Sequence, residues 1–490
     1  MTESGDHSYA STTTLLEGLR SGRWSSVELV EHFQARVMKH NPTLNAIILD
    51  RFDQALEQAR QADERRSNGE DLPLLGLPMT IKESIDVAGL PATSGMPEHA
   101  SRIPERDAPL VRSLKEAGAI IFGKTNLPYG CNDWQANSPI YGTTNNPWDL
   151  TRTPGGSTGG GAAALAAGLT PLEIGSDIGG SVRVPASFSG VYGHRQSETL
   201  VPQSGHFPGH ALPNRAVVLN IMGPLARSAD DLELALEMIA GPEEGESTAW
   251  KVELPASRHE RLADFRVAVF PDLDWLPVSN DVREARDRVV TALLDAGATV
   301  AEASPDGFGD LREYHKLYCR MLRSVTSLDL DLDAREELLE LAATRGDQFD
   351  ETVEDAINGT PADFIIWHGQ REGYRGAFRT FFERFDVLLS PITLTTAFKH
   401  IPSEKAGLDD YLRMFAVDDR EVPYDYQVVY PGLSTLCGQP STAFPAGISS
   451  DGLPVGLQAI GPYLEDRTPI RFAALLAREI GGFQAPPNYA

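Results

Sequence analysis

The sequence predicts an α/β protein in which helices cover both faces of a β-sheet. From Leu72 onward, apolar segments of strand length alternate with helical segments, and glycine turns separate them. A helix around 108–117 leads through an Ala-Gly-Ala turn into the apolar run 119–122, and the same order returns over 281–301. Alternation of this kind is typical of a sheet that lies between helical layers.

Several elements carry their own start and stop signals. Ser25 and Glu28 have the spacing of a capping box, so a helix is expected to begin after Ser25 and to end at Asn41-Pro42. Helical periodicity also predicts helices over roughly 50–66 and 228–240. Further strands are expected at 266–270, 386–390 and 454–460.

The chain has no low-complexity linker that would divide it into independent domains. We therefore expect a flexible tail over residues 1–12 and a single domain over 13–490. The stretch 305–380 is charged and shows helical periodicity without a strand pattern. We expect it to form a helical excursion or a lid over the core.

Composition and charge exclude several classes of partner. The 490 residues carry 69 acidic and 43 basic side chains, a formal charge of −26. Nucleic acids and anionic membranes attract clustered Lys and Arg, so neither is expected as a partner. No secretory signal and no apolar run of membrane-spanning length is visible, and the three cysteines are widely spaced. These features predict a cytoplasmic enzyme in a reducing compartment.

Two serines stand in glycine-rich turns. Ser157 lies within Gly155–Gly161, and Ser181 follows Gly179-Gly180. Glycine permits positive φ and close backbone approach, so such turns can direct several N–H groups at one point. A serine hydroxyl beside such N–H groups is what acyl transfer requires, because the hydroxyl attacks and the amides receive the oxyanion. Lys82, within Pro78–Ser84, is a candidate base.

Two other interpretations of the first turn fit the residues less well. A phosphate-binding P-loop requires a lysine after its last glycine, and none follows Gly161. Gly155-x-Ser157-x-Gly159 has the spacing of a nucleophile elbow, but such an elbow follows a core strand, whereas 148–154 is typical of a turn. Tight packing before an Ala-rich helix is the simplest structural alternative.

The sequence resembles the amidase signature family. The resemblance is carried by the run from Gly155 through Gly160 and on through Ser176-Asp177-Ile178-Gly179-Gly180-Ser181-Val182-Arg183-Val184-Pro185-Ala186. It extends to four further segments and covers roughly 15–480: Gly123–Asn126, Asn145–Trp148, Gly223–Ser228 and Gly452–Gln458. The resemblance implies a single α/β/α domain around a mixed, mainly parallel sheet.

The resemblance also implies a Ser–cis-Ser–Lys triad. Ser181 would be the nucleophile, Ser157 the bridging serine in a cis peptide, and Lys82 the base. A lysine can act as a base only if its pKa is lowered, and the apolar neighbours of Lys82 favour its burial. The oxyanion hole would consist of the backbone N–H groups of Ile178, Gly179, Gly180 and Ser181.

Asp177 and Arg183 flank the proposed oxyanion turn. Our hypothesis is that they pair and brace it, the alternative being two separately solvated charges. Thr158 stands where the family usually has a second serine, so its hydroxyl is retained and a methyl group is added. We expect Thr158, like the two charged residues, to support the site.

Three aromatic residues follow the Gly123–Asn126 segment, where the resemblance suggests the acyl pocket. They are Tyr129, Trp134 and Tyr141. Aromatic side chains at this density are as often part of the core as in contact with a ligand. We therefore take them as candidate pocket residues and keep the core alternative open.

The expected function is hydrolysis of a carboxylic amide through an acyl-enzyme, without a metal or cofactor. Esters, anilides and carbamates share this chemistry. One alternative is an amidotransferase A-type subunit that acts as a glutaminase with partner proteins, although Ser189 and His194-Arg195-Gln196 depart from the family's usual residues. The second is a non-catalytic scaffold, which the intact Ser181, Ser157 and Lys82 disfavour. The expected partner is a small-molecule substrate, and a homodimer is considered.

Overall fold

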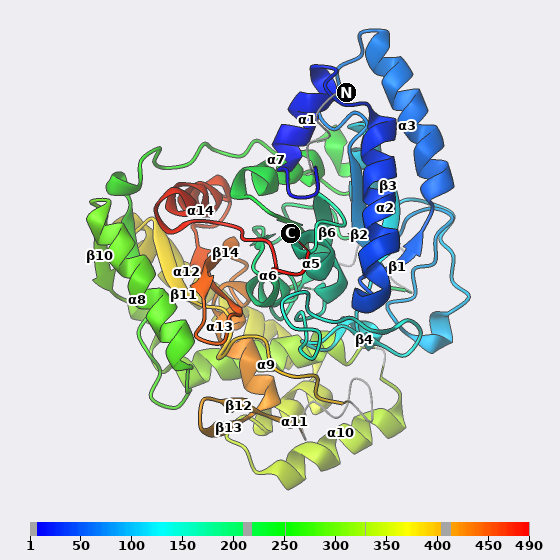
Figure 1. The fold of residues 1–490 in the computed structure, drawn as a ribbon. Helices are drawn as coiled ribbons and strands as arrows, with labels where there is room; N and C mark the ends of the chain where they lie inside the picture. Colours follow the sequence, from blue (N-terminus) through cyan, green and yellow to red (C-terminus); the bar gives the residue numbers. More distant parts are fainter. Residues whose placement is uncertain (1–6, 209–217, 250, 329, 403–412, 490) are drawn as a thin grey trace.

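The computed structural model describes residues 7–208, 218–249, 251–328, 330–402 and 413–489. An eleven-stranded sheet runs through the middle of the protein (Figure 1). Its strands, from one edge to the other, are β1 (Ile47–Asp50), β3 (Ile120–Thr125), β2 (Pro78–Lys82), β6 (Leu172–Asp177), β8 (Ile221–Ala226), β7 (Tyr192–Arg195), β14 (Ser441–Ile448), β15 (Pro454–Ile460), β11 (Val387–Pro391), β9 (Arg266–Val269) and β10 (Thr299–Glu302).

The described residues form helices before, between and after these strands. They are α1 (Thr12–Arg20), α2 (Ser26–Leu44), α3 (Phe52–Ser67), α4 (Pro109–Glu116), α5 (Gly159–Ala166), α6 (Arg183–Ser189), α7 (Ala229–Ile239), α8 (Asn280–Asp295), α9 (Leu311–Thr326), α10 (Leu332–Arg345), α11 (Glu351–Asn358), α12 (Pro361–Arg384), α13 (Val429–Thr435) and α14 (Arg467–Ile480). The described residues also form short 3₁₀ segments and two small hairpins: η1 (Pro97–His99), η2 (Tyr129–Cys131), η3 (Glu246–Thr248), η4 (Leu262–Asp264), η5 (Asp306–Phe308), η7 (Tyr424–Val428), β4 (Asn137–Ser138) with β5 (Gly142–Thr143), and β12 (Met414–Val417) with β13 (Arg420–Pro423).

The predicted fold class is confirmed, because the sheet is mixed and helices pack against it. Parallel neighbours form one block, β3-β2-β6, and a second block, β11-β9-β10. Antiparallel neighbours join the two blocks through β8, β7, β14 and β15 and add β1 at the edge. Parallel pairing therefore has a smaller share of the sheet than the resemblance implied.

Helices α6 and α14 cover opposite faces of the sheet. A Cβ at Gly456 of β15 would lie 2.7 Å from the Ser187 backbone in α6. The next residue, Leu457, pairs with Phe444 of β14, whose ring lies 6.4 Å from that of Phe472 in α14. Because successive strand residues point to opposite faces, α6 lies on one side and α14 on the other. The face that carries α6 also carries α5, which contacts it.

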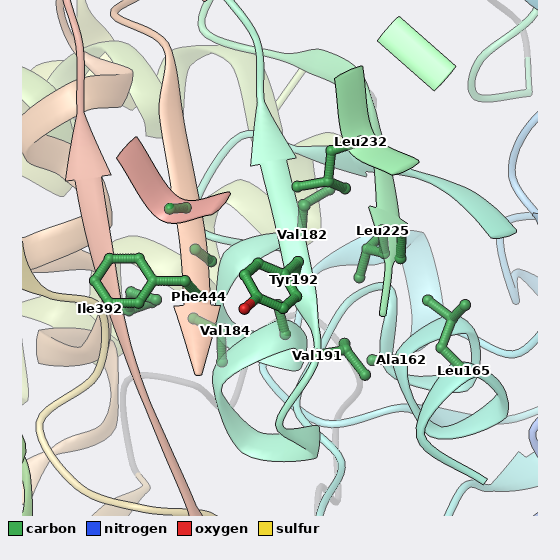
Figure 2. Packing of buried hydrophobic residues seen from close by; sticks show 14 of the residues in the cluster. Ala162, Leu165, Val182, Val184, Val191, Tyr192, Leu225, Leu232, Ile392 and Phe444 are labelled. Atoms are coloured by element: carbon green, nitrogen blue, oxygen red, sulfur yellow. The ribbon is translucent and has the colours of Figure 1, made fainter. Parts of the chain in front are cut away.

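The hydrophobic core lies along both faces of the sheet. Figure 2 shows Ala162 and Leu165 of α5 near Leu225 of β8, with Leu232 of α7 close by. These four side chains are completely buried. Every residue of α5 is buried, so this short helix is a core element rather than a surface one. Because α5 is packed inside the core, it holds the residues that immediately precede it in a defined position.

The helix predicted after Ser25 begins as expected, but its predicted end is wrong. The capping box between Ser25 and Glu28 is present, and α2 then continues through Pro42 to Leu44. Proline has no N–H, so α2 passes through residue 42 with one backbone hydrogen bond fewer. The chain leaves the helix at Asn45, which has a φ of 52°. The Asn41 side chain accepts hydrogen bonds from the N–H groups of residues 46 and 47, which stabilises the exit.

The flexible tail predicted over 1–12 is not confirmed for the residues that the structure describes. Ser8 is fully buried, and the Tyr9 hydroxyl donates a hydrogen bond to the Tyr489 carbonyl at 2.6 Å. The Thr12 N–H donates to the Asp231 carboxylate of α7 at 2.9 Å. Long-range contacts with two later segments, invisible to local sequence patterns, hold this stretch in place. Residues 1–6 of the predicted tail lie outside the described residues.

The stretch predicted to be a helical excursion is helical. Helices α9 to α12 lie between β10 and β11, and the described residues from 303 to 386 include no strand. Helix α9 packs against α13 and α12, which brings this insertion against the main body. None of the helices formed by the described residues is both long enough and apolar enough to cross a membrane.

The close approach of α5 to β3 gives the first prediction. A Cβ at Gly160 would lie 2.3 Å from the Asn126 nitrogen and 2.6 Å from the Ala46 carbonyl oxygen. Because both neighbours are backbone atoms, Gly160→Ala is expected to lower the free energy of unfolding by about 1–3 kcal/mol, measured by urea titration. Gly241→Ala is the control, since a Cβ there meets no atom within 4 Å. Equal stability of the two variants would contradict this packing.

Candidate active site

Lys82 and Ser157 are in direct contact inside the protein. The Lys82 Nζ, at the end of β2, donates hydrogen bonds to the Ser157 Oγ at 2.6 Å and to the Ser176 Oγ at 2.8 Å. Lys82 and Ser157 are fully buried, and Ser176 is 3% exposed. The peptide bond between Gly156 and Ser157 is cis. The strand β2, the residues before α5, and β6 therefore meet at one amine.

Ser181 lies in the turn that connects β6 to α6, directly beside the cis peptide. The Thr158 N–H donates a hydrogen bond to the Ser181 carbonyl at 3.1 Å. Ser181 is 7% exposed, which leaves its side chain near the boundary of the buried region. The sequence segments that contain Ser157 and Ser181 are thus joined by a backbone hydrogen bond.

Burial lowers the pKa of the Lys82 ammonium. Desolvation disfavours the charged form, and the nearby Cys131, Asp177 and Glu173 oppose it without reversing the shift. The amine donates to the Ser157 and Ser176 hydroxyls, and no carboxylate of the described residues forms a salt bridge with it. Burial therefore shifts the amine toward its neutral form, the form that can accept a proton.

Glu173 of β6 is a buried carboxyl on the face of the sheet that α5 covers. Its oxygens accept hydrogen bonds from the Thr80 hydroxyl at 2.5 Å and from the Thr125 hydroxyl at 2.6 Å. Burial raises its pKa to about 8, against the opposing effects of the two hydroxyls and Lys82. A Cβ at Gly161 of α5 would lie 2.6 Å from the Glu173 side chain, so α5 seals this carboxyl from solvent.

The turn of residues 178–181 presents several backbone N–H groups. Gly180 has a φ of 100°, which favours glycine. Its N–H donates to the Asp177 Oδ1 at 2.9 Å, so the structure already uses one of the four predicted oxyanion donors. Among the described residues, the N–H groups of Ile178, Gly179 and Ser181 have no hydrogen-bond acceptor.

The expected pair between Asp177 and Arg183 is present and completely buried. The Arg183 Nε and Nη2 donate to the two Asp177 oxygens, each at 2.9 Å. Asp177 also accepts from the Val182 N–H at 3.1 Å. Burial alone would raise the pKa of Asp177, but the Arg183 charge and these hydrogen bonds hold it well below its ordinary value. The ion pair thus spans the turn that contains Ser181.

Arg183 connects this turn to the C-terminal half of the chain. Its guanidinium donates to the Pro431 carbonyl at 3.0 Å, to the Ser434 hydroxyl at 2.7 Å and to the Gln458 Oε1 at 2.8 Å. It also donates to the Thr435 hydroxyl at 2.9 Å. Helix α13 and strand β15 are therefore anchored to the start of α6 by a single side chain.

Of the three candidate pocket aromatics, Trp134 contacts the 178–181 turn. Its Nε1 donates to the Gly179 carbonyl at 3.0 Å. The Tyr129 hydroxyl donates instead to Glu98 at 2.6 Å, and the Tyr141 hydroxyl donates to Glu83 at 3.2 Å. The structure therefore links Trp134 to the 178–181 turn, while the two tyrosine hydroxyls bind the carboxylates of Glu98 and Glu83.

Thr158 is fully buried and packs against β6. Its hydroxyl lies 3.4 Å from the Ser176 carbonyl, to which it donates. A Cβ at Gly175 would lie 2.5 Å from the Thr158 methyl carbon, so the methyl occupies space that the glycine leaves. Thr158 is thus accommodated by a neighbouring glycine.

The candidate site also contains residues that the sequence did not single out. Ser176 binds Lys82, and it lies within the recognised run, where a hydroxyl next to Asp177 was the available signal. Tyr318 of α9 donates to the Ile178 carbonyl at 2.8 Å, and no sequence pattern marks it. No group of three or more His, Cys, Asp or Glu side chains in the described part of the chain is placed to hold a metal ion.

Comparison with known proteins assigns a family. The model of the Amidase family matches residues 28–469. The chain is 31% identical to the fatty-acid amide hydrolase 2-B of Danio rerio, with 97% of this chain and 90% of that protein covered. It is 33% identical to the indoleacetamide hydrolase of Bradyrhizobium diazoefficiens, with 91% and 82% covered. A solved amidase structure superimposes with a TM-score of 0.76 at 27% identity, covering 96% of this chain and all of that one.

The alternative of an amidotransferase also has a relative among known proteins. The chain is 33% identical to the A-type component of the glutamyl-tRNA(Gln) amidotransferase of Acidothermus cellulolyticus, with 92% of this chain and 90% of that protein covered. Identity to this protein is as high as identity to the amide hydrolases. Overall similarity therefore identifies the family.

The buried ion pair gives the second prediction. Asp177→Asn leaves the Arg183 guanidinium buried without its counter-charge and is expected to lower the free energy of unfolding by about 3–5 kcal/mol. The control is Glu244→Gln in the exposed pair with Arg106, where the side chains are 60% and 75% exposed. That change is expected to cost less than about 1 kcal/mol in the same denaturant titration. Similar losses in both variants would contradict a bracing role for Asp177.

Glu173 gives a third prediction, on pH. The folded-state pKa of about 8 lies above the ordinary 4.5, so between these values the folded protein holds a proton that the unfolded chain has lost. The carboxyl's contribution to stability is full below about pH 4.5 and declines as pH rises toward 8. Relative to Glu173→Gln, which does not titrate, the wild type should therefore lose stability over this range. Parallel stability curves for the two proteins would show that Glu173 titrates normally.

Proposed function

Because the chain belongs to the amidase family and is an enzyme that cleaves amide C–N bonds, we propose that Ser181 is its nucleophile, with Ser157 and Lys82 as its proton relay. The observation that carries this proposal is the 2.6 Å hydrogen bond between the buried Lys82 Nζ and the Ser157 Oγ, next to the turn of Ser181. A serine needs a base to become an effective nucleophile, and a desolvated lysine can supply one.

The proposed reaction begins with attack of the Ser181 Oγ on the amide carbonyl carbon. The Ser181 proton passes to the Ser157 Oγ while the Ser157 proton passes to the neutral Lys82 Nζ. The carbonyl π electrons move to the oxygen, which becomes the oxyanion of a tetrahedral intermediate. The N–H groups of Ile178, Gly179 and Ser181 are the proposed donors to this oxygen, since that of Gly180 is held by Asp177.

Collapse of the intermediate breaks the C–N bond. Lys82 returns its proton to Ser157, which protonates the leaving nitrogen, and the amine departs. A water molecule then attacks the acyl-enzyme through the same relay and releases the carboxylic acid and free Ser181. Protons and electron pairs balance over the two steps, and neither step needs a cofactor.

We further propose that the acyl group is apolar. Three side chains lie half-buried around the site, and none of them is charged: Ile178 in the turn, Trp134 bonded to that turn, and Cys131 near the Lys82 amine. An apolar acyl chain would bury these surfaces on binding. A set of p-nitroanilides with acyl chains of increasing length is the probe of this preference. The homodimer and the cytoplasmic location stay predictions.

Labelling by a fluorophosphonate probe, read by intact mass and peptide mapping, tests the catalytic roles. We expect one adduct at Ser181 in the wild type and none in Ser181→Ala. Lys82→Met, which keeps the side-chain volume, should slow labelling by about 10²–10⁴-fold, because general-base catalysis contributes about that much. The control is Ser187→Ala in α6, which removes a buried hydroxyl that binds the Gly456 N–H and should leave the labelling site unchanged.

The pH dependence of labelling has a defined sign. Lys82 accepts a proton only when neutral, and its pKa is lowered by burial, so the rate should rise with pH through that pKa and then level off. An adduct at Ser157 would assign the nucleophile to the other turn. Release of ammonia from glutamine only after mixing with partner proteins would instead indicate the amidotransferase alternative.

A further inference from the structure

Two side chains from outside the 178–181 turn hold its carbonyl groups. The Tyr318 hydroxyl of α9 donates to the Ile178 carbonyl at 2.8 Å, and the Trp134 Nε1 donates to the Gly179 carbonyl at 3.0 Å. Both donors therefore act on consecutive peptide groups of the turn. The oxyanion hole of the proposed reaction consists of N–H groups from this same turn.

A carbonyl held in this way also fixes the N–H on the other side of the peptide. In a trans peptide the C=O of one residue and the N–H of the next point in opposite directions within one plane. The bond from Tyr318 to the Ile178 carbonyl therefore directs the Gly179 N–H away from α9. The bond from Trp134 acts on the next peptide, whose N–H, that of Gly180, binds Asp177. Among the described residues no acceptor takes the Gly179 N–H.

Tyr318 is itself held rigidly. Its side chain is fully buried, and a Cβ at Gly432 of α13 would lie 2.7 Å from its ring. One helical turn earlier, the Tyr314 hydroxyl donates to the Leu433 carbonyl of α13 at 2.7 Å. Helix α9 is therefore fastened to α13, and the hydroxyl of Tyr318 is presented to the turn from a packed helix. Side chains carried by helices or strands are positioned more precisely than side chains carried by loops.

We propose that Tyr318 is a positioning residue for the oxyanion hole, whose hydroxyl sets the direction of the Gly179 N–H. This inference rests on the proposed function of the 178–181 turn. The helical insertion would then contribute to catalysis, because Tyr318 of α9 orients the peptide that carries the Gly179 N–H. The hydroxyl touches neither substrate nor the reacting atoms and acts through the peptide between Ile178 and Gly179.

The test compares Tyr318→Phe with Tyr314→Phe. Each variant removes one buried tyrosine hydroxyl from α9 and with it one hydrogen bond to a backbone carbonyl, but only the first bond holds the turn. The substrate is the p-nitroanilide that the wild type hydrolyses fastest. The inhibitor is a trifluoromethyl ketone with the same acyl group, which forms a tetrahedral adduct with an oxyanion. Thermal unfolding of both variants reports the structural cost.

We expect Tyr318→Phe to lower kcat by about 10–100-fold, since small errors in catalytic geometry have effects of that size. Its affinity for the trifluoromethyl ketone should fall by a similar factor, while KM stays within about twofold, because the loss concerns the transition state rather than substrate binding. Tyr314→Phe should leave kcat and ketone affinity within about twofold while showing a similar change in unfolding temperature.

Equal effects of the two variants on kcat and on ketone affinity would overturn the inference, because the hydroxyl would then be structural only. If Tyr318→Phe does not fold, Gly432→Ala is the second variant. Its added Cβ would lie 2.7 Å from the Tyr318 ring and displace it, so the same loss of kcat and ketone affinity is expected. An unchanged kcat in that variant would also overturn the inference. An active wild type distinguishes these results from failure of the proposed function, in which the wild type neither hydrolyses an anilide nor labels at Ser181.

Discussion

The buried ion pair between Asp177 and Arg183 is the interaction on which the rest of the site depends. Neither side chain is accessible to solvent, so each charge is tolerable only because the other is present. Asp177 ends β6 and Arg183 begins α6, and the pair therefore closes the turn that carries Ser181. The same guanidinium binds α13 and β15. A large desolvation cost is thus offset by the assembly of four elements around one residue.

Burial of Lys82 connects the fold to the chemistry. An amine buried at the meeting point of β2, β6 and the residues before α5 loses its hydration, which favours the neutral form. Its hydrogen bonds go to the hydroxyls of Ser157 and Ser176 rather than to a carboxylate. A charged Glu173 would raise the pKa of Lys82. Because burial raises the pKa of Glu173 itself to about 8, its carboxyl carries less negative charge at neutral pH. Desolvation therefore shifts both groups toward their neutral forms.

The glycines of the recognised run allow α5 and the sheet to approach closely. A Cβ at Gly160 would meet backbone atoms of Asn126, one at Gly161 would meet the Glu173 carboxyl, and one at Gly175 would meet Thr158. The run is thus rich in glycine for reasons of packing as well as for the direction of N–H groups. The interpretation of tight packing and the interpretation of a catalytic turn describe the same residues.

The sequence by itself determined the family, the mixed α/β fold with its helical insertion and the segments that meet at the site, because the residues that form the turns around Ser157 and Ser181 are contiguous and chemically restricted. The roles of these residues stay proposals. The tertiary structure alone decided that Trp134 rather than Tyr129 or Tyr141 binds the turn, that Gly180 donates to Asp177, and that Tyr318 supports Ile178. Tyr318 lies 140 positions from Ile178 along the chain. Local patterns encode local conformation, whereas a contact over that separation depends on how helices pack, and nothing in the residues around Tyr318 specifies its partner.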